Sequence, residues 1–336
     1  MTPILERLLE SSSLDEAEAG ALFAVLADPT TSSALAGAYL AALRTKGESV
    51  AELRGLARAM RARMRRCDLG TSEVVDVVGT GGDHARSFNL STGAALLAGA
   101  AGVPIAKHGS GAVSGRSGAA DVLSALGVRL PGDEAAARSL FEVTGFTFLH
   151  APSFHPALAG VGAVRRALGT RTVFNLLGPL CNPAGPAYAV IGAATLDAAR
   201  LIAEVAVDLP FRRVFVVHGA EAWDEPTPVG PFHLFDVRAG AIERSERDPL
   251  AIGLPRCSSA ALRGGDAGTN AHALRAALCG ERSSHRDALV LGAALALEVA
   301  GMAGSPEDAV IRAASAIDDG RASAFLSDLA ARSHHA

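Results

Sequence analysis

A glycine-rich segment with a polar continuation is the first part of the sequence suited to chemistry. The stretch DVVGTGGDHARSFNLSTG runs from Asp76 to Gly93. Glycines after a strand let backbone N–H groups approach an anion closely, and the start of a following helix adds partial positive charge. The order G-T-G-G-D matches neither Walker A nor G-x-G-x-x-G, and a tight strand-to-helix turn alone would also need glycines. Because NLST adds hydroxyl and amide groups, we predict a phosphate site.

A second segment, KHGSGAVSGRSGAADVL, combines a lysine with interleaved serines and glycines. Lys107 directly follows an apolar run, and Ser110, Ser114 and Ser117 follow it in the loop. A mobile ammonium group and several hydroxyls together match the oxygens of phosphate groups. A flexible surface linker shares this composition but needs no lysine directly after a buried strand. We therefore predict a second phosphate-binding loop, in which His108 packs or hydrogen-bonds locally.

Two adjacent carboxylates, Asp224 and Glu225, follow the apolar run RVFVVHG. Such a pair is unfavourable unless water or a cation neutralises it. Mg²⁺ usually takes one or two carboxylates together with waters and substrate phosphates. A solvated acidic turn is the alternative for this motif taken alone. Beside two predicted phosphate segments, the pair predicts a magnesium site.

Arg165 and Arg166 are adjacent in the stretch HPALAGVGAVRRALG. Neighbours on a predicted helix point in different directions, so at most one of them needs to face a site. A guanidinium group binds a carboxylate through two parallel hydrogen bonds. A surface salt bridge is the alternative for either arginine.

The overall composition excludes several classes of function. The chain has 336 residues, 49% of them hydrophobic, and a formal net charge of −4 from 31 basic and 35 acidic residues. This balance argues against a nucleic-acid partner. The four cysteines are scattered without a CxxC pair, which disfavours a zinc site or disulfide framework and suits a reducing cytosol. The N-terminus lacks a long apolar region, and the apolar runs are interrupted by glycine and proline. We therefore expect a cytoplasmic protein with no membrane partner.

The first part of the chain, to about residue 66, predicts helices only. Ser13 with Glu16 and Ser49 with Glu52 fit the capping box. The breakers DPTT (28–31) and TKGE (45–48) end two of these helices. We predict a helical domain over residues 1–68, completed by helices around residues 160–185.

After Gly70 the pattern changes to short β-branched or aromatic runs separated by Ala-rich helical stretches. This alternation predicts an α/β domain over residues 70–336, with a largely parallel central sheet flanked by helices. Ligands of such sheets bind beyond the carboxyl ends of the strands. An added strand and turn is expected at 231–240, and Ser305 is expected to cap a helix that begins at Pro306. The central runs are 73–79, 103–109, 146–152, 188–193 and 213–219.

Several blocks in chain order resemble the anthranilate phosphoribosyltransferase family. They are GTGGD with NLST, KHG with SGAADVLSALG, HP with VRRALG, TVFNLLGPLCNP, and VHG with DE, and the likeness extends to GGDAGTNA at 264–271. The resemblance implies transfer of the phosphoribosyl group of phosphoribosyl pyrophosphate (PRPP) to the amine of anthranilate, with release of pyrophosphate. It also implies a small helical domain joined to an α/β domain, and a homodimer formed through the helical part.

The resemblance assigns roles to individual residues. Arg165, Gly79 and Ser110 would contact anthranilate, and Ser91, Asp224 and Glu225 would hold Mg²⁺, as a pair of ions. Asp83 would meet a ribose hydroxyl or a magnesium-associated group rather than bare phosphate. No side-chain nucleophile is implied: Lys107 and Mg²⁺ would stabilise the departing pyrophosphate, and His108 and His155 are candidate bases. The residues implied in PRPP binding are Gly79, Gly82, Asp83, Ser87, Asn89, Leu90, Ser91, Thr92, Lys107, His108, Gly109, Ser110, Gly111, Ala112, Val113, Ser114, Gly115 and Ala119.

The sequence departs from the family pattern at a few positions, which leaves the acceptor open. Ser110 replaces an asparagine that contacts anthranilate, and Ala119 replaces a serine that contacts phosphate. Gly111, Trp223 and Gly292 replace a common Arg, Leu and Asn. The alternatives are a paralogous phosphoribosyltransferase acting on another aromatic amine or acid, a nucleoside phosphorylase, and a non-catalytic relative that binds nucleic acid.

Overall fold

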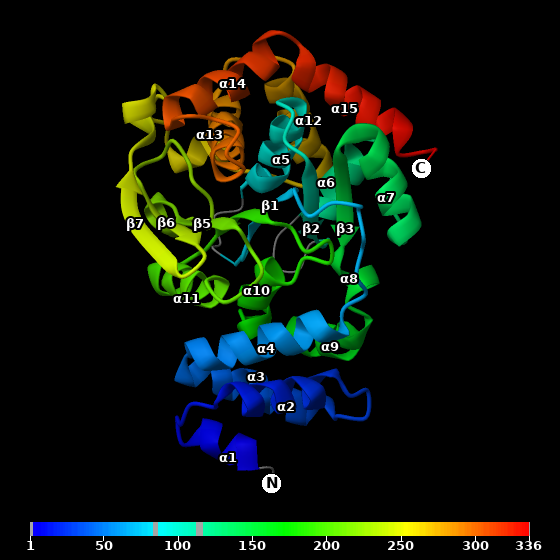
Figure 1. Ribbon diagram of the computed structural model, residues 1–336, viewed down its shortest axis with the longest axis vertical. Coiled ribbons are helices and arrows are strands. Elements are labelled where there is room, and N and C mark those ends of the chain that lie inside the picture. Colours follow the sequence, from blue (N-terminus) through cyan, green and yellow to red (C-terminus); the bar gives the residue numbers. More distant parts are fainter. Residues whose placement is uncertain (1–2, 83–86, 112–116, 336) are drawn as a thin grey trace.

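A computed structural model describes residues 3–82, 87–111 and 117–335 (Figure 1). The chain forms a small N-terminal helical domain beneath a larger α/β domain, which confirms the predicted fold class. Among the described residues, no helix has both the length and the apolar character needed to cross a membrane. The four cysteines are all free thiols.

The helical domain begins with four helices, of which α2 and α3 end at the predicted breakers DPTT and TKGE. The box predicted from Ser49 and Glu52 is confirmed, whereas that from Ser13 and Glu16 is wrong. Asp15 caps the second helix instead, exchanging hydrogen bonds of 2.9 Å with Glu18. A carboxylate two residues further along accepts the free N–H group, so the helix starts later. The helices are α1 (Pro3–Leu9), α2 (Glu16–Ala27), α3 (Ser33–Lys46) and α4 (Val50–Arg63).

A seven-stranded sheet in the order β3-β2-β1-β4-β5-β6-β7 forms the centre of the α/β domain. The first five strands of this order are parallel, and β6 and β7 add an antiparallel edge. The sequence predicted the parallel strands and β6, but missed β7, whose mostly exposed and charged sequence AIERSER carries no apolar signal. The strands are β1 (Val75–Gly79), β2 (Ile105–Gly109), β3 (Phe146–His150), β4 (Tyr188–Gly192), β5 (Arg213–His218), β6 (Phe232–Arg238) and β7 (Ala241–Arg247).

Helices cover both faces of the sheet (Figure 1). The upper layer in the view contains α5, α12, α13, α14 and α15, whereas α10 and α11 lie on the side of the helical domain. Ser305 caps α14 and Pro306 begins it, as predicted. The remaining helices are α5 (Leu90–Ala100), α6 (Ala119–Ala125), α7 (Glu134–Thr144), α8 (Ala151–Phe154), α9 (Ala159–Leu168), α10 (Val173–Leu177), α11 (Leu196–Ala206), α12 (Ala267–Leu278), α13 (Ser284–Val299), α14 (Pro306–Asp318) and α15 (Arg321–Arg332), with short 3₁₀ turns at Pro156–Leu158, Gly178–Leu180, Ala220–Ala222, Pro249–Ile252 and Ser259–Leu262.

The two faces of the sheet have separate hydrophobic cores. One core joins the upper helices to side chains such as Val77 and Phe215. The other runs without a break from Leu22 and Tyr39 of the helical domain to Ile191 and Val216 of the sheet. The chain returns to the helical domain after β3, where α9 packs on α3 and α10 packs on α4. The helical domain is therefore fastened to the lower face of the sheet by shared apolar packing.

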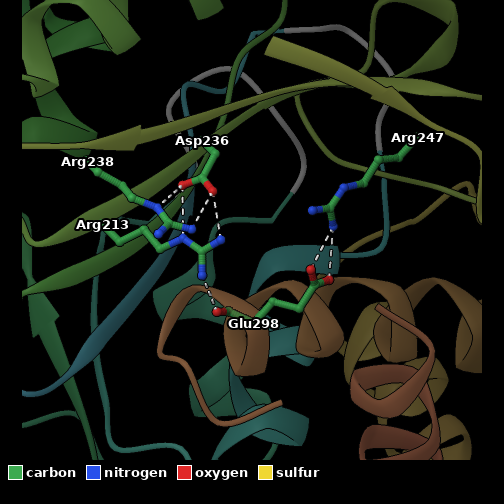
Figure 2. Close-up of polar contacts among 5 residues, drawn as sticks. All are labelled: Arg213, Asp236, Arg238, Arg247 and Glu298. Carbon is green, nitrogen blue, oxygen red and sulfur yellow. Dashed lines mark hydrogen bonds and ion pairs between the residues drawn. The ribbon is translucent and has the colours of Figure 1, made fainter. Parts of the chain in front are cut away.

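A polar network fixes the antiparallel edge of the sheet near Arg213, the first residue of β5 (Figure 2). Asp236 accepts two hydrogen bonds from Arg213, at 2.9 and 2.7 Å, and contacts Arg238 as well. Arg213 also donates to the backbone oxygen of Glu298, whose carboxylate pairs with Arg247 at 2.8 Å. The network thus ties β5, β6 and β7 to the end of α13.

Close packing of α2 against α4 depends on a glycine, and this predicts a stability change. A Cβ atom on Gly55 would overlap the backbone oxygen of Glu16 and lie 2.9 Å from Cβ of Ala19. Since backbone cannot move aside cheaply, we expect Gly55→Ala to lower the free energy of unfolding by about 1–3 kcal/mol in urea denaturation. Gly20→Ala is the matched control, because an added Cβ there meets nothing within 4 Å. Equal stabilities of the two variants would contradict the packing described.

Candidate active site

The acidic segment lies directly across the carboxyl ends of three strands. Gly79 ends β1, Gly192 ends β4 and Gly219 follows β5. A Cβ atom on Gly79 would overlap the Asp224 carboxylate, and one on Gly192 would overlap its backbone oxygen. A Cβ atom on Gly219 would overlap the backbone oxygen of Glu225. Glycine at these three ends lets the backbone and side chains of the acidic pair contact the strand ends closely. The strand order reverses between β1 and β4, and ligands of α/β sheets commonly bind at such a point.

Hydrogen bonds join the acidic pair to the first predicted phosphate segment. Asp224 accepts from the backbone N–H of Gly81 at 2.5 Å. Glu225 accepts from the backbone N–H of Ser91 at 2.8 Å and from the Ser87 hydroxyl at 3.0 Å. Motifs that lie more than 130 residues apart in the chain therefore form one site.

The donor set fits a hard divalent cation. Asp224 and Glu225 are only 6% and 8% exposed, and the Ser91 hydroxyl lies beside them at the start of α5. Among the described residues, no group of three or more His, Cys, Asp or Glu side chains is arranged for a metal. Two carboxylates completed by waters and substrate oxygens suit Mg²⁺ rather than a transition metal.

A small cavity adjoins the acidic pair between the sheet and the helices α5 and α13. Its polar wall is formed by Ser91, Asp224 and Glu225, and its other walls are mainly apolar. Gly292 lines it on α13, and a Cβ atom there would lie only 2.6 Å from Cβ of Ala94 on α5. Gly292 therefore allows α13 to pack tightly against α5.

Lys107 lies inside the site rather than in a mobile loop. It is the middle residue of β2 and is 2% exposed. Its Nζ donates to the backbone oxygen of Val77 at 2.5 Å and to the Ser91 hydroxyl at 3.5 Å. Burial lowers the pKa of Lys107, while the negative charges of Asp76 and Glu225 raise it. The sequence predicted a mobile charge, but the structure fixes the ammonium group beneath the start of α5.

Asn89 links the two predicted phosphate segments. Its backbone is left-handed, with φ of 65°, immediately before α5. The side chain donates to the backbone oxygen of Ser117 at 3.2 Å and accepts from Asn270 at 2.7 Å. Ser110 lies against the start of α6, since its backbone oxygen accepts from Ala120 at 3.3 Å. Asn270 was missed by the sequence analysis, although it belongs to the matched block GGDAGTNA.

The other residues implied in PRPP binding lie around this junction or outside the described part of the chain. A Cβ atom on Gly109 would lie 3.4 Å from that of Ala119, and one on Gly111 would lie 3.3 Å from Asp121. Gly82 has φ of +75° and packs against Arg171, which the sequence analysis missed. Leu90 and Thr92 are buried in α5, and Asp83, Ala112, Val113, Ser114 and Gly115 lie outside the described residues.

Arg165 approaches the glycine-rich turn from the helical side. Its guanidinium group donates to Asn175 at 3.5 Å and lies 5.6 Å from the ring centre of Phe174. Asn175 in turn donates to the backbone oxygen of Thr80 at 3.1 Å. Burial lowers the pKa of Arg165. Arg166 is exposed, whereas Arg165 is half-buried. Asn175 was not predicted as a site residue.

His108 of β2 and His155 form a buried aromatic pair. Their ring centres lie 5.1 Å apart, and neither Nε2 has a hydrogen-bond partner among the described residues. Burial lowers the pKa of His108 to about 3 and that of His155 to about 4. Both rings are therefore neutral at pH 7.

Comparison with known proteins identifies the family to which both domains belong. The model of the glycosyl transferase family α/β domain matches residues 71–323, and that of its helical bundle domain matches residues 2–64. The anthranilate phosphoribosyltransferase of Methylocella silvestris is 44% identical over 336 residues, covering 100% of this chain and 96% of that protein. The chain belongs to the anthranilate phosphoribosyltransferase family.

Other members agree in sequence and in fold. The Methylobacterium radiotolerans anthranilate phosphoribosyltransferase is 46% identical, covering 97% of this chain and 94% of that protein. The crystal structure of the Thermus thermophilus anthranilate phosphoribosyltransferase superimposes with a TM-score of 0.91 at 37% identity, covering 99% and 100% of the two chains. The Saccharomyces cerevisiae enzyme in complex with PRPP and Mg shares the fold, with a TM-score of 0.87 at 24% identity, covering 99% and 97%.

The buried histidines predict a dependence of stability on pH. Because the folded pKa of His155, about 4, lies below its ordinary value, the unfolded chain binds an extra proton between about pH 6.5 and 4. Stability contributed by the neutral ring is thus present above about pH 6.5 and is lost as the pH falls. We expect urea denaturation of His155→Gln to show a shallower loss, by up to about 1.4 kcal/mol per pH unit.

The same substitution at exposed His335 is the control, because it removes a histidine without touching the buried pair. Identical slopes for wild type and His155→Gln would show that the ring takes up no extra proton on unfolding.

Proposed function

We propose that this chain transfers the 5-phosphoribosyl group of PRPP to the amine of anthranilate, giving N-(5-phosphoribosyl)anthranilate and pyrophosphate in tryptophan biosynthesis. The observation that carries the proposal is the junction of the glycine-rich turn, the start of α5 and the acidic pair, through Gly81, Ser91, Asp224 and Glu225. Membership of the family over the whole chain supports the same reaction.

PRPP is assigned to the place where the two glycine-rich segments meet, which Asn89 links to Ser117. The glycine-rich turn and the start of α5 suit its phosphates, because glycine allows close approach to the backbone and the start of a helix carries partial positive charge. Gly109, Ser110 and Gly111, at and after the end of β2, are proposed to contact it from the second segment, whereas Ala112, Val113, Ser114 and Gly115 lie outside the described residues. Asp83 is proposed to meet a ribose hydroxyl or a group associated with the metal.

Ser91, Asp224 and Glu225 are the residues that would hold Mg²⁺, for which we propose a pair of ions. When bound, the metal supplies positive charge that stabilises the pyrophosphate leaving group. A Saccharomyces cerevisiae relative of the same fold is in complex with PRPP and Mg, which supports magnesium as the metal.

The residues of the chain act by alignment and electrostatics rather than as nucleophiles. As the bond from C1 of the ribose to pyrophosphate breaks, C1 becomes cationic, and the anthranilate amine forms the new bond to it and gives up one proton to water or to the departing pyrophosphate. The fixed ammonium group of Lys107 faces the developing negative charge without having to reorganise. Arg165 holds the acceptor carboxylate. His108 and His155, with pKa values of about 3 and 4, are poor bases, so neither is assigned as a general base.

We further infer a homodimer formed through the helical domain and a cytoplasmic location, both from the family resemblance. Sedimentation equilibrium of the purified chain distinguishes a dimer from a monomer.

The decisive assay follows the loss of anthranilate fluorescence in the presence of PRPP and Mg²⁺. Turnover that requires all three components is the expected result. Turnover of another aminobenzoate but not of anthranilate would keep the reaction class and reject the acceptor, for which Ser110 is the position to examine. Phosphate-dependent cleavage of a nucleoside, or salt-sensitive DNA binding without PRPP turnover, would reject the proposal altogether.

Arg165 should determine the use of the acceptor. We expect Arg165→Ala to raise KM for anthranilate roughly tenfold or more, because a charge-assisted contact with the carboxylate is lost. KM for PRPP should change little. Arg166→Ala is the matched control, since that side chain is exposed on the same helix. Equal increases in both KM values for Arg165→Ala would contradict the assigned role.

A further inference from the structure

The strands β1 and β2 separate where the proposed site begins. β1 pairs with β4 along its whole length, from Val75 to Gly79, and β2 pairs with β3 in the same complete way. Between β1 and β2, however, only Val75 and Ile105 are paired. The parallel ladder therefore opens toward the carboxyl ends of these two strands.

Buried side chains occupy the opened seam. Asp76 accepts a hydrogen bond from the backbone N–H of His108 at 3.1 Å. A β1 side chain thus satisfies a backbone N–H group of β2 that the strand pairing leaves free. Asn182 donates to the other Asp76 oxygen at 2.8 Å and to the backbone oxygen of Ala106 at 2.7 Å. Asp76 is completely buried and Asn182 is 1% exposed. Two polar side chains thus replace backbone pairing between the strands.

Lys107 satisfies another backbone group that the missing strand pairing leaves free. Its Nζ donates to the backbone oxygen of Val77, which is a β1 group facing β2. Burial, partly offset by the nearby charge of Lys107, raises the pKa of Asp76 to about 6. The seam therefore contains a carboxylate and an ammonium group that compensate each other in a region without solvent.

The position of the seam connects it to the two phosphate segments. β1 leads directly into the turn at Gly79–Gly82, and β2 leads into Gly109, Ser110 and the loop beyond. The separation of the strands consequently sets the distance between these segments. A continued ladder would satisfy the same backbone groups without burying a charge, which is costly. Burying the Asp76 charge is justified if the site requires β1 and β2 to stand apart.

We propose that Asp76 and Asn182 are positioning residues that hold β1 and β2 apart and thereby set the spacing of the PRPP site. The inference rests on the proposed function. Asn182 belongs to the connection that follows α10, so the segment returning from the helical domain takes part in holding β1 and β2 apart.

The test is the affinity for PRPP in the presence of Mg²⁺, measured by titration calorimetry. In Asp76→Asn one amide donor must face another donor, from Asn182 or from the His108 backbone. We expect Kd for PRPP to rise roughly tenfold, since a buried charge-assisted contact is lost. Asp236→Asn is the control, because it breaks a partly buried ionic network away from the site (Figure 2). It should lower stability without changing Kd.

A second pair of variants keeps the test decisive if Asp76→Asn folds poorly. Asn182→Ala removes both donors and should weaken PRPP binding, whereas Asn182→Ser keeps one donor and should weaken it less. Folded Asp76 or Asn182 variants that bind PRPP as tightly as wild type would overturn the inference and leave the proposed function intact. Wild type that fails to bind PRPP with Mg²⁺ would instead reject the proposed function itself.

Discussion

The close approach of the Asp224–Glu225 segment to the ends of β1, β4 and β5 is the constraint on which the site depends. Gly79, Gly192 and Gly219 leave room for this segment, and a single added methyl group at any of them would overlap it. Only from this depth do the carboxylates reach the N–H groups of Gly81 and Ser91. Acidic side chains held by backbone amides are pre-organised, because little of their conformational freedom remains to be lost when a cation and a phosphorylated ligand bind.

The site is assembled from both layers of the molecule. The sheet and the upper helices supply the phosphate segments, whereas the helical side supplies Arg165, Asn175 and Asn182. Asn175 and Asn182 each donate to groups of β1 or the turn that follows it, at 3.1 and 2.8 Å. Polar contacts from one short connection therefore reach both the glycine-rich turn and the strand that leads to it. Arg165 and the glycine-rich turn are thus linked through hydrogen bonds of Asn175.

Much of the architecture was predictable because it is encoded locally. Apolar runs predicted the five parallel strands and β6. The chain's family followed from several blocks in order. Asp15 was missed because two nearby residues compete to cap one helix. Asp76, Asn175 and Asn182 were missed because their partners are remote in sequence, 106 residues apart for Asp76 and Asn182, although an aspartate inside VVDVVG was a usable signal.

One hydrophobic core runs from Leu22 and Tyr39 of the helical domain to Ile191 and Val216 of the sheet, so the two domains are not independent units. A bundle that shares its interior with a sheet does not behave as an interchangeable module. A chimaera that grafts the bundle of a distant relative onto this sheet would have to recreate the matching apolar surface on both parts. Evolutionary change in the two portions is accordingly expected to be correlated across that boundary.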